Sequence, residues 1–526
     1  MSQEKDLGLI THLAKRGIDD KMVMGHPAGL FVLFFTEMWE RFSYYGMRAL
    51  LVIFLVSQVA DGGWEWSRSE AMNLFGLYTM LVYFTPLLGG IIADRFTGFR
   101  KAIVWGAVIM TLGHASMALE TINPNFFYIG LGLMILGNGM FKPNISSMVG
   151  QLYPDNSTKK DAGYTIFYMG INAGAFLGML LCGYIGEKVG WHYGFGLAGV
   201  FMMFGGLQFY FATKLFGVVG ESPKEHKESV KTGVEEEEEI LPKNVVRDRL
   251  IVVGVLMFFS IFFFLSFEQA GGSMSIFALD YTQRVLPGDA GTIFMWVDTI
   301  LTLFPLVIVT YVLWSLGKKI YSKYPTTIIF TAISFLIVWG LGLWKIGREF
   351  NAIETEVTAS WFQILNSFFI ITLASIFSKM WEKVWNPPGP VKFALGLILV
   401  GVGFAVLAYG AKDIPQGAQT ASVSMIWLIA AYFFHTTGEL CLSPVGLSYV
   451  SKLSPKKFVG LIFGLWFTAS GIANGLAGFG GGLIDRIAEE HSLSYFFGIF
   501  AVMPAAAGFV LILISPILKK MMHGIH

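Results

Sequence analysis

The chain has 526 residues, of which 54% are hydrophobic and only 14% are charged, whereas an ordinary soluble domain carries about 25% charged residues. Its net charge of +1 excludes the strongly basic surface of a nucleic-acid-binding protein. The two cysteines, Cys182 and Cys441, lie far apart in apolar segments, so we interpret them as buried hydrophobic residues and not as a disulfide or metal pair.

Apolar segments of roughly 20 to 25 residues recur along the chain, which matches a hydrocarbon core about 30 Å thick. Backbone polar groups in lipid must be satisfied internally, so these segments are predicted to be helices. After a polar tail at 1–27, six spans are expected at 28–58, 71–92, 101–120, 126–150, 163–186 and 192–216. A charged linker at 217–247 contains the run Glu235 to Glu239. Eight more spans are expected at 248–279, 292–316, 326–346, 359–384, 391–411, 423–451, 458–484 and 494–518, before a tail at 519–526.

The Lys and Arg residues are distributed unevenly between the predicted loops. If the N-terminus is cytoplasmic, 27 of the 37 fall in cytoplasmic segments and seven in outer loops, among them Arg68 and Lys345. Cytoplasmic loops carry an excess of positive residues, so both termini and the linker are predicted to be cytoplasmic. The expected location is a cell membrane, inner or plasma, that the chain crosses many times. We interpret the linker as a solvated connection between two bundles.

The first span carries Glu37, Glu40 and Arg41, and charged residues at a helix centre cost roughly 2.5 to 3.5 kcal/mol each. Their spacing of i, i+3 and i+4 places them on one helix face, with Glu37 and Arg41 in the favourable order for an ion pair. The alternative is a packing salt bridge that only joins helices. An apolar replacement of such a pair would usually be cheaper, which favours a functional site.

Four further polar residues lie inside predicted spans. Lys142 precedes Pro143, which frees a backbone carbonyl, so this helix is predicted to bend beside a cavity, although snorkelling of Lys142 is an alternative. Glu268 and Glu439 lie in otherwise apolar helices, where carboxylates typically form proton relays or cation sites. His435 lies one turn before Glu439 and is a weaker candidate, because a lone histidine is more often a satisfied core residue.

Other side chains in the spans are ambiguous. Asn172 is flanked by glycines that permit close helix packing, so packing and ligand roles stay open. The aromatic residues Tyr44, Tyr45, Tyr83 and Trp466 could equally belong to the helix core.

The loop after the second span contains a sequence signature over residues 90–101. Gly90, Asp94, Arg95 and Arg100 occupy the defining positions of a pattern that resembles the G-x-x-x-D-R-x-x-G-x-R-K cytoplasmic loop of the major facilitator superfamily. The resemblance implies a conformational or gating role for this loop. It also implies two six-helix halves related by pseudo-symmetry, with a midplane site between them.

Four separated motifs are similar to those of the proton-dependent oligopeptide transporter family. They are Glu37-x-x-Glu40-Arg41-Phe42, Gly139-x-Phe141-Lys142-Pro143-Asn144, Phe167-Tyr168-x-x-Ile171-Asn172-x-Gly174 and Glu439-Leu440-x-x-Ser443-Pro444. The resemblance implies that Arg41 and Lys142 contact the peptide carboxylate and that Glu439 meets the peptide amino group. It implies proton coupling through Glu37, Glu40 and Arg41, with Glu268 as the seventh-helix acid that some members use. The residues implied to line the pocket are Tyr44, Tyr45, Tyr83, Asn172, Ser443 and Trp466.

The chain departs from the family pattern in two ways. Fourteen spans exceed the superfamily's twelve, and bacterial members often carry an extra helix pair in the linker between the halves. Here Glu268 marks the seventh helix and Trp361-Phe362-Gln363-x-x-Asn366 resembles the eighth, so the extra pair falls at 292–346. The second span also lacks the histidine of animal members, so proton coupling is expected to rest on carboxylates.

The sequence therefore predicts an all-α polytopic membrane protein with the major facilitator fold, a six-helix bundle at 28–216 and a second bundle at 248–518 that includes the extra pair. The predicted function is proton-coupled symport of di- and tripeptides by alternating access. The alternative is transport of nitrate or another small anion, against which Glu439 argues because an anion has no amino group. No enzyme motif and no sizeable soluble sensor domain is recognisable. Expected partners are short peptides, protons and the bilayer, with no cofactor, nucleic acid or obligate protein partner.

Overall fold

The computed structural model describes residues 2–154, 157–222, 242–455 and 458–525. Most of the predicted linker, including the run Glu235 to Glu239, lies outside the described residues. Between its loops the described chain is helical, with two antiparallel pairs of two-residue strands. The strands β1 (Met22–Val23) and β2 (His26–Pro27) form a hairpin, whereas β3 (Val285–Leu286) and β4 (Thr355–Glu356) pair although they lie far apart in the chain.

Each of the fourteen apolar segments predicted above coincides with one long helix. These helices are α2 (Ala28–Val56), α3 (Arg68–Ile92), α4 (Gly98–Met117), α5 (Asn125–Gln151), α6 (Thr158–Lys188), α7 (Trp191–Ala212), α9 (Lys243–Phe267), α11 (Gly288–Ile320), α12 (Pro325–Phe350), α13 (Ile364–Lys383), α14 (Gly389–Gly410), α15 (Ile426–Leu453), α16 (Val459–Gly481) and α18 (Leu493–Met521). Shorter helices are α1 (Ser2–Lys15), α10 (Ser273–Ile276) and α17 (Ile484–Glu490). The helical prediction is confirmed.

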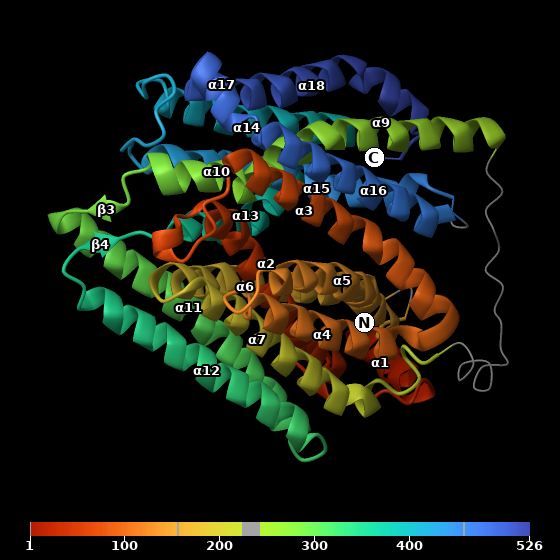
Figure 1. The fold of residues 1–526 in the computed structure, drawn as a ribbon. Coiled ribbons are helices and arrows are strands. Elements are labelled where there is room, and N and C mark those ends of the chain that lie inside the picture. The colour runs from red at the N-terminus through yellow and green to blue at the C-terminus, as the bar shows by residue number, and fades with distance from the viewer. Residues whose placement is uncertain (1, 155–156, 223–241, 456–457, 526) are drawn as a thin grey trace. The chain divides into compact units, whose positions relative to one another are not determined.

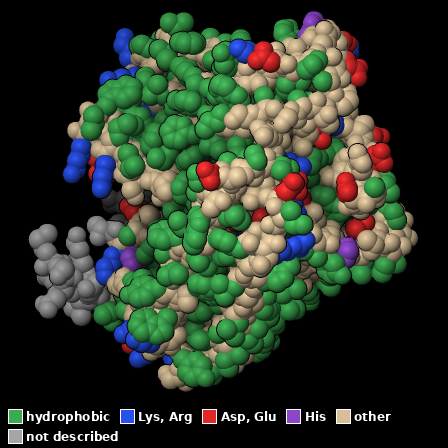
Figure 2. All heavy atoms as spheres, turned by 90° about the vertical axis from the view of Figure 1, so that its left-hand side faces the viewer, with side chains coloured by type: hydrophobic (Ala, Val, Ile, Leu, Met, Phe, Trp, Pro, Cys, Tyr) green, Lys and Arg blue, Asp and Glu red, His purple; other side chains and the backbone are tan. Residues whose placement is uncertain are grey.

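Among the described residues, ten helical segments are long and apolar enough to cross a membrane. The helix α2 is not one of the ten, because Glu37, Glu40, Arg41 and Arg48 interrupt its apolar sequence. Hydrophobic side chains cover much of the face seen in Figure 2, and residues such as Leu88, Leu336 and Leu513 are exposed. A polytopic membrane protein explains these exposed side chains, while the total of fourteen spans stays a prediction.

By backbone contacts the chain divides into two compact units. Unit 1 comprises Met1–Leu50, Thr85–Gly233 and Val285–Val357, and unit 2 comprises Leu51–Phe84, Val234–Arg284 and Thr358–His526. The extra pair α11–α12 groups with unit 1 and the adjoining ends of α2 and α3 group with unit 2. The predicted bundle limits at 216 and 248 stay a prediction.

In unit 1, α12 packs against α7 and α11 packs against α6, and the pair lies along these helices in Figure 1. A chain of buried polar side chains crosses this contact. Thr331 of α12 donates a hydrogen bond to Gln208 Oε1 of α7, and Gln208 Nε2 donates to Thr36 Oγ1 of α2 over 3.0 Å. The amide of Gln208 therefore joins the extra pair to the helix that carries Glu37.

The charge distribution placed Lys345 in an outer loop, but the structure does not. It lies within α12, where it is buried and forms an ion pair with Asp298 of α11. The ammonium also lies 5.1 Å from the ring centre of Tyr184 on α6. Lys345 falls at the end of the predicted span 326–346 and was counted with the outer loop that follows, because a sequence pattern cannot show that a partner on another helix offsets its charge.

The predicted N-terminal tail is ordered where it is described. Beyond α1, Arg16 Nη1 donates to Gln151 O over 2.9 Å, and the backbone N–H of Asp19 donates to Leu215 O over 2.9 Å. The carboxylate of Asp19 pairs with Lys323 in the turn between α11 and α12, at 2.7 Å. The tail therefore connects one end of the extra pair to the rest of unit 1.

In unit 2, α14 packs against α15 and α18, and α9 packs against α16 and α18. Arg68 begins α3 and is another residue that the sequence placed in an outer loop. It is buried and forms ion pairs of 2.7 Å with Asp280 and with Asp485. This network attaches the start of α3 to the segments around α10 and α17.

Candidate functional site

Three of the charged residues of α2 form one buried cluster in unit 1. Arg41 Nε lies 3.1 Å from Glu37 Oε1 and also forms an ion pair with Glu40 Oε2. The exposed fractions of Glu37, Glu40 and Arg41 are 2%, 0% and 3%. One turn of helix therefore holds a cation between two carboxylates, as the i, i+3 and i+4 spacing predicted.

Asn138 of α5 is a member of this cluster that the sequence analysis missed. Its Nδ2 donates a hydrogen bond to Glu40 Oε1 over 3.0 Å, and its side chain is fully buried. An amide one turn before Lys142 in an apolar helix was the available signal. Arg41 Nη2 and Glu37 Oε2 are buried without a hydrogen-bond partner among the described residues. The cluster thus has a donor and an acceptor left for a substrate or a proton.

Aromatic and amide side chains surround Arg41 and its neighbours in sequence. The guanidinium carbon of Arg41 lies 5.3 Å from the ring centre of Tyr44 and 5.9 Å from that of Tyr45. Lys142 is half-buried on α5, within electrostatic range of Glu37. Asn172 of α6 is buried, and its Nδ2 donates to Tyr168 O over 3.0 Å within its own helix.

The glycines of α6 explain how this helix approaches α2. Gly170, Gly174 and Gly178 lie at intervals of four residues on one helix face. A Cβ atom at these positions would meet Phe34, the carbonyl of Met38 and the carbonyl of Phe42 respectively. The backbone of α6 therefore lies directly against that of α2, and the glycines around Asn172 have the packing role that the sequence left open.

In unit 2 the half-buried carboxylate of Glu439 is held by a neighbouring helix. Asn366 of α13 donates a hydrogen bond to Glu439 Oε2 over 2.9 Å and lies 3.2 Å from Thr436 Oγ1. The sequence pattern around Asn366 indicates the eighth helix, but it does not predict this contact with Glu439. Glu268 begins a buried 3₁₀ turn after α9 and acts electrostatically on Glu439. The two acids belong to one region of unit 2.

The other residues predicted in unit 2 have different surroundings. Trp466 of α16 is buried against Gly446 and lies 6.2 Å from the ring centre of Phe393, so helix packing accounts for its position. Ser443 and Tyr83 are half-buried, on α15 and α3. His435 is buried with its ring 4.5 Å from that of Phe404, a core environment.

The signature loop between α3 and α4 forms a short π-helix over Ala93–Thr97. Asp94 and Arg95 are exposed, and a Cβ atom at Gly90 would meet nothing within 4 Å. Arg100 Nε donates to Val219 O over 2.5 Å, and its guanidinium also donates to Gly217 O. Arg100 thereby fastens the loop to the segment that follows α7.

A model of the POT family matches residues 100–235 and 327–497, more than half of the chain. The chain belongs to the POT family. The uncharacterized transporter YclF of Bacillus subtilis is 33% identical, with 97% of this chain and 98% of the relative covered. The di-/tripeptide transporter of Lactococcus lactis subsp. cremoris is 30% identical, with 95% and 98% covered.

A solved structure has the same fold over nearly its whole length. It is a crystal structure of a mutant of the peptide transporter POT in complex with alafosfalin, with a TM-score of 0.74 and 29% sequence identity. The match covers 97% of this chain and 99% of that one. The predicted POT membership and major facilitator fold are confirmed, and the roles of the individual site residues stay proposals.

Proposed function

We propose that this POT-family protein imports di- and tripeptides together with protons by alternating access. The observation that carries the proposal is the buried cluster on α2, in which Arg41 is held by Glu37 and Glu40 and retains a free donor at Nη2. A buried cation with two acids is costly in a membrane helix, and such residues typically mark a site of substrate binding or proton coupling.

The substrate class follows from the signs of the charges in the two units. A short peptide is a zwitterion, so it requires a cation for its carboxylate and an anion for its amino group. Arg41 and Lys142 of unit 1 are proposed to bind the carboxylate, and Glu439 of unit 2 the amino group. Tyr44, Tyr45, Tyr83, Asn172, Ser443 and Trp466 are proposed to line the pocket.

Proton coupling is proposed to act through the ion pairs of Arg41. A proton that enters from outside neutralises Glu37 or Glu40 and weakens the hold on the guanidinium. The freed guanidinium then captures the peptide carboxylate, and the two halves move to release both inside. Glu268 is the second candidate for the proton site, because it is buried and lies near Glu439.

The small-anion alternative gains no support from the relatives, since the Lactococcus protein and the solved neighbour are named as peptide transporters. We further propose that both termini are cytoplasmic in an inner or plasma membrane. The signature segment with Gly90, Asp94, Arg95 and Arg100 is then on the cytoplasmic side, where it would gate the conformational change. The proton gradient is the proposed driving force, without a cofactor or an obligate protein partner.

An uptake assay with purified protein in liposomes tests this function. Labelled dialanine should accumulate when the proton gradient is directed inward and should only equilibrate when the gradient is collapsed with a protonophore. Accumulation of nitrate in place of dialanine would contradict the proposal, and so would dialanine uptake that does not respond to the gradient.

A further inference from the structure

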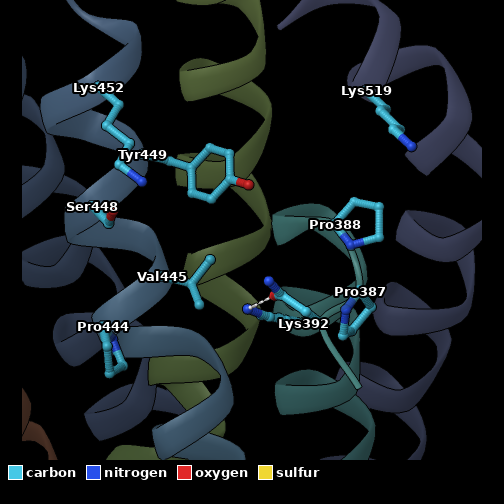
Figure 3. Close-up of a pocket in the computed structure, with 10 residues that line it drawn as sticks. Pro387, Pro388, Lys392, Pro444, Val445, Ser448, Tyr449, Lys452 and Lys519 are labelled. Atoms are coloured by element: carbon cyan, nitrogen blue, oxygen red, sulfur yellow. Dashed lines mark hydrogen bonds between the residues drawn. The ribbon is translucent and has the colours of Figure 1, made fainter. Parts of the chain in front are cut away.

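A cavity of about 610 Å³ lies within unit 2, where α13, α14, α15 and α18 come to one end (Figure 3). Asn386 of the α13–α14 loop and Lys392 of the first turn of α14 line it. The last turns of α15 contribute Tyr449 and Lys452, and the end of α18 contributes Lys519. In Figure 3, Lys452 and Lys519 lie on opposite sides of this space, with Lys392 below them.

The charge of the cavity lining has one sign. Lys392, Lys452 and Lys519 are its only charged residues, and in the described part of the chain none of them forms an ion pair. Lys392 Nζ donates to Asn386 Oδ1 over 2.7 Å, and Lys452 acts on Lys392 as a like charge. Lys392 and Lys452 repel one another as like charges, and no acid lines the cavity, so an anion would bind here favourably.

The cavity also has neutral hydrogen-bonding groups. Tyr449 is only 6% exposed, and its hydroxyl accepts a hydrogen bond of 3.1 Å from the backbone N–H of Gly389. That bond orients the hydroxyl hydrogen away from α14, where it can be donated to a ligand. The hydroxyl of Ser448 lies on the same wall. Lysine ammonium groups with oriented hydroxyls suit the oxygens of a phosphate.

The position of the cavity favours a lipid over a soluble anion. It lies at the ends of four membrane helices, which the Lys and Arg distribution places on the cytoplasmic side. Leu513 and Ile517 of α18 are 77% and 60% exposed, within two turns of Lys519. Val384 and Trp385, next to Asn386 in the chain, are also exposed. Apolar surface below basic residues, with a tryptophan at the interface, is typical of a lipid contact.

We propose that this cavity binds the phosphate of an anionic phospholipid headgroup, with Lys392, Lys452 and Lys519 as the cationic ligands. Tyr449 donates a hydrogen bond to the same phosphate, and the acyl chains lie against the exposed apolar residues of α18. The site is separate from the peptide site, and nothing in the proposal depends on the transported substrate.

Binding of dioctanoyl phosphatidylglycerol to the purified full chain in detergent, followed by native mass spectrometry, tests the proposal. A lysine near an anionic lipid contributes about a fivefold factor in affinity. The triple variant Lys392→Gln, Lys452→Gln and Lys519→Gln should therefore bind about 100-fold more weakly. The matched triple variant Lys318→Gln, Lys319→Gln and Lys520→Gln loses the same charge outside the cavity and should bind as the native chain does.

Binding of two other ligands shows whether the phosphate comes from a lipid or from a free anion. Dioctanoyl phosphatidylcholine and inorganic phosphate should each bind far more weakly than phosphatidylglycerol. If inorganic phosphate competes equally well, the site takes a free anion and the lipid proposal is wrong. It is also wrong if both triple variants lose the same affinity. If the triple variant does not fold, the single variants Lys452→Gln and Lys519→Gln replace it, because they change exposed side chains. Each should weaken binding about fivefold. Lys452→Arg keeps the charge and should retain binding.

Discussion

Arg41 is held by two carboxylates. Their role in proton coupling can be distinguished from peptide binding by measuring both gradient-driven uptake and peptide exchange. Glu37→Gln or Glu40→Gln mimics permanent protonation of one acid. Each should abolish accumulation driven by a proton gradient but retain exchange of labelled for unlabelled peptide, since exchange needs no net proton movement. Arg41→Ala should also weaken peptide binding, by about 2 to 5 kcal/mol if a desolvated charge pair is lost.

Both activities are measured in the same liposomes, as gradient-driven uptake and as counterflow. If both Glu variants accumulate peptide fully, protons are coupled elsewhere, and Glu268 is the next candidate. Loss of exchange together with accumulation would mean that the cluster is structural or binds substrate directly, and the ion-pair release mechanism would then be wrong.

Glu439 and Asn366 form a second pair whose function depends on the peptide amino group. Glu439→Gln should weaken the binding of dipeptides by several kcal/mol. It should weaken the binding of N-acetylated analogues much less, because these lack the positive charge. Asn366→Ala should have a smaller effect, about 1 kcal/mol, since it removes one hydrogen bond that orients the carboxylate. Competition against labelled dialanine measures both, and equal losses for free and acetylated peptides would remove Glu439 from this role.

At the scale of helices, the contact of α6 with α2 depends on Gly174. A Cβ atom there would meet the backbone carbonyl of Met38, which cannot move as a side chain can. Gly174→Ala should therefore lower stability by about 1 to 3 kcal/mol, a typical cost of overpacking. The control is Gly254→Ala on α9, where a Cβ atom meets nothing within 4 Å and stability should be unchanged or higher. Thermal unfolding in detergent compares the two, and equal melting temperatures would contradict the prediction.

The connection between the N-terminal segment and the extra pair should depend on pH. Burial acts to raise the pKa of Asp19, but hydrogen bonds from Lys323 and from the backbone N–H of Lys21 hold this pKa below its usual value of 3.8. A lowered carboxyl pKa stabilises the fold above the unfolded value, and this stability is lost as the pH falls through the folded value. Because Lys323 is 63% exposed, the gain is at most about 1 kcal/mol.

Asp19→Asn tests this connection. Its melting temperature should lie slightly below that of the native chain at pH 7, and the difference should shrink below about pH 4, near the unfolded pKa of aspartate. A difference that is constant from pH 3 to pH 8 would exclude the carboxylate as its cause.

At the scale of the whole molecule, the orientation in the membrane is still to be measured. Lys319, in the last turn of α11, and Asp413, after α14, are exposed and lie on opposite predicted sides, so each is replaced by a single cysteine. The native Cys182 and Cys441 are buried, so they should react little. An impermeant thiol reagent should label Asp413→Cys in intact cells and Lys319→Cys only after permeabilisation. Labelling of both in intact cells would overturn the orientation.

The sequence predicted features that depend on local pattern and missed those that depend on contacts between helices. Segment length and hydropathy located all fourteen long helices, and helical spacing predicted the pair of Glu37 with Arg41. The contacts of Asn138 with Glu40 and of Asn366 with Glu439 join helices far apart in sequence, so no local period encodes them. The grouping of α11 and α12 with unit 1 was hidden for the same reason.

The amide of Gln208 bears on how the extra pair was acquired. Among the described residues, Thr331 of α12 donates to its Oε1, while its Nε2 donates to Thr36 and Val32 of α2. A shorter chain without residues 288–350 would leave this carbonyl facing lipid, at a cost of several kcal/mol. Gln208 should therefore be unfavourable in a chain that lacks these two helices. Twelve-helix homologues should have an apolar residue at this position, so one residue of α7 would date the insertion in a family tree.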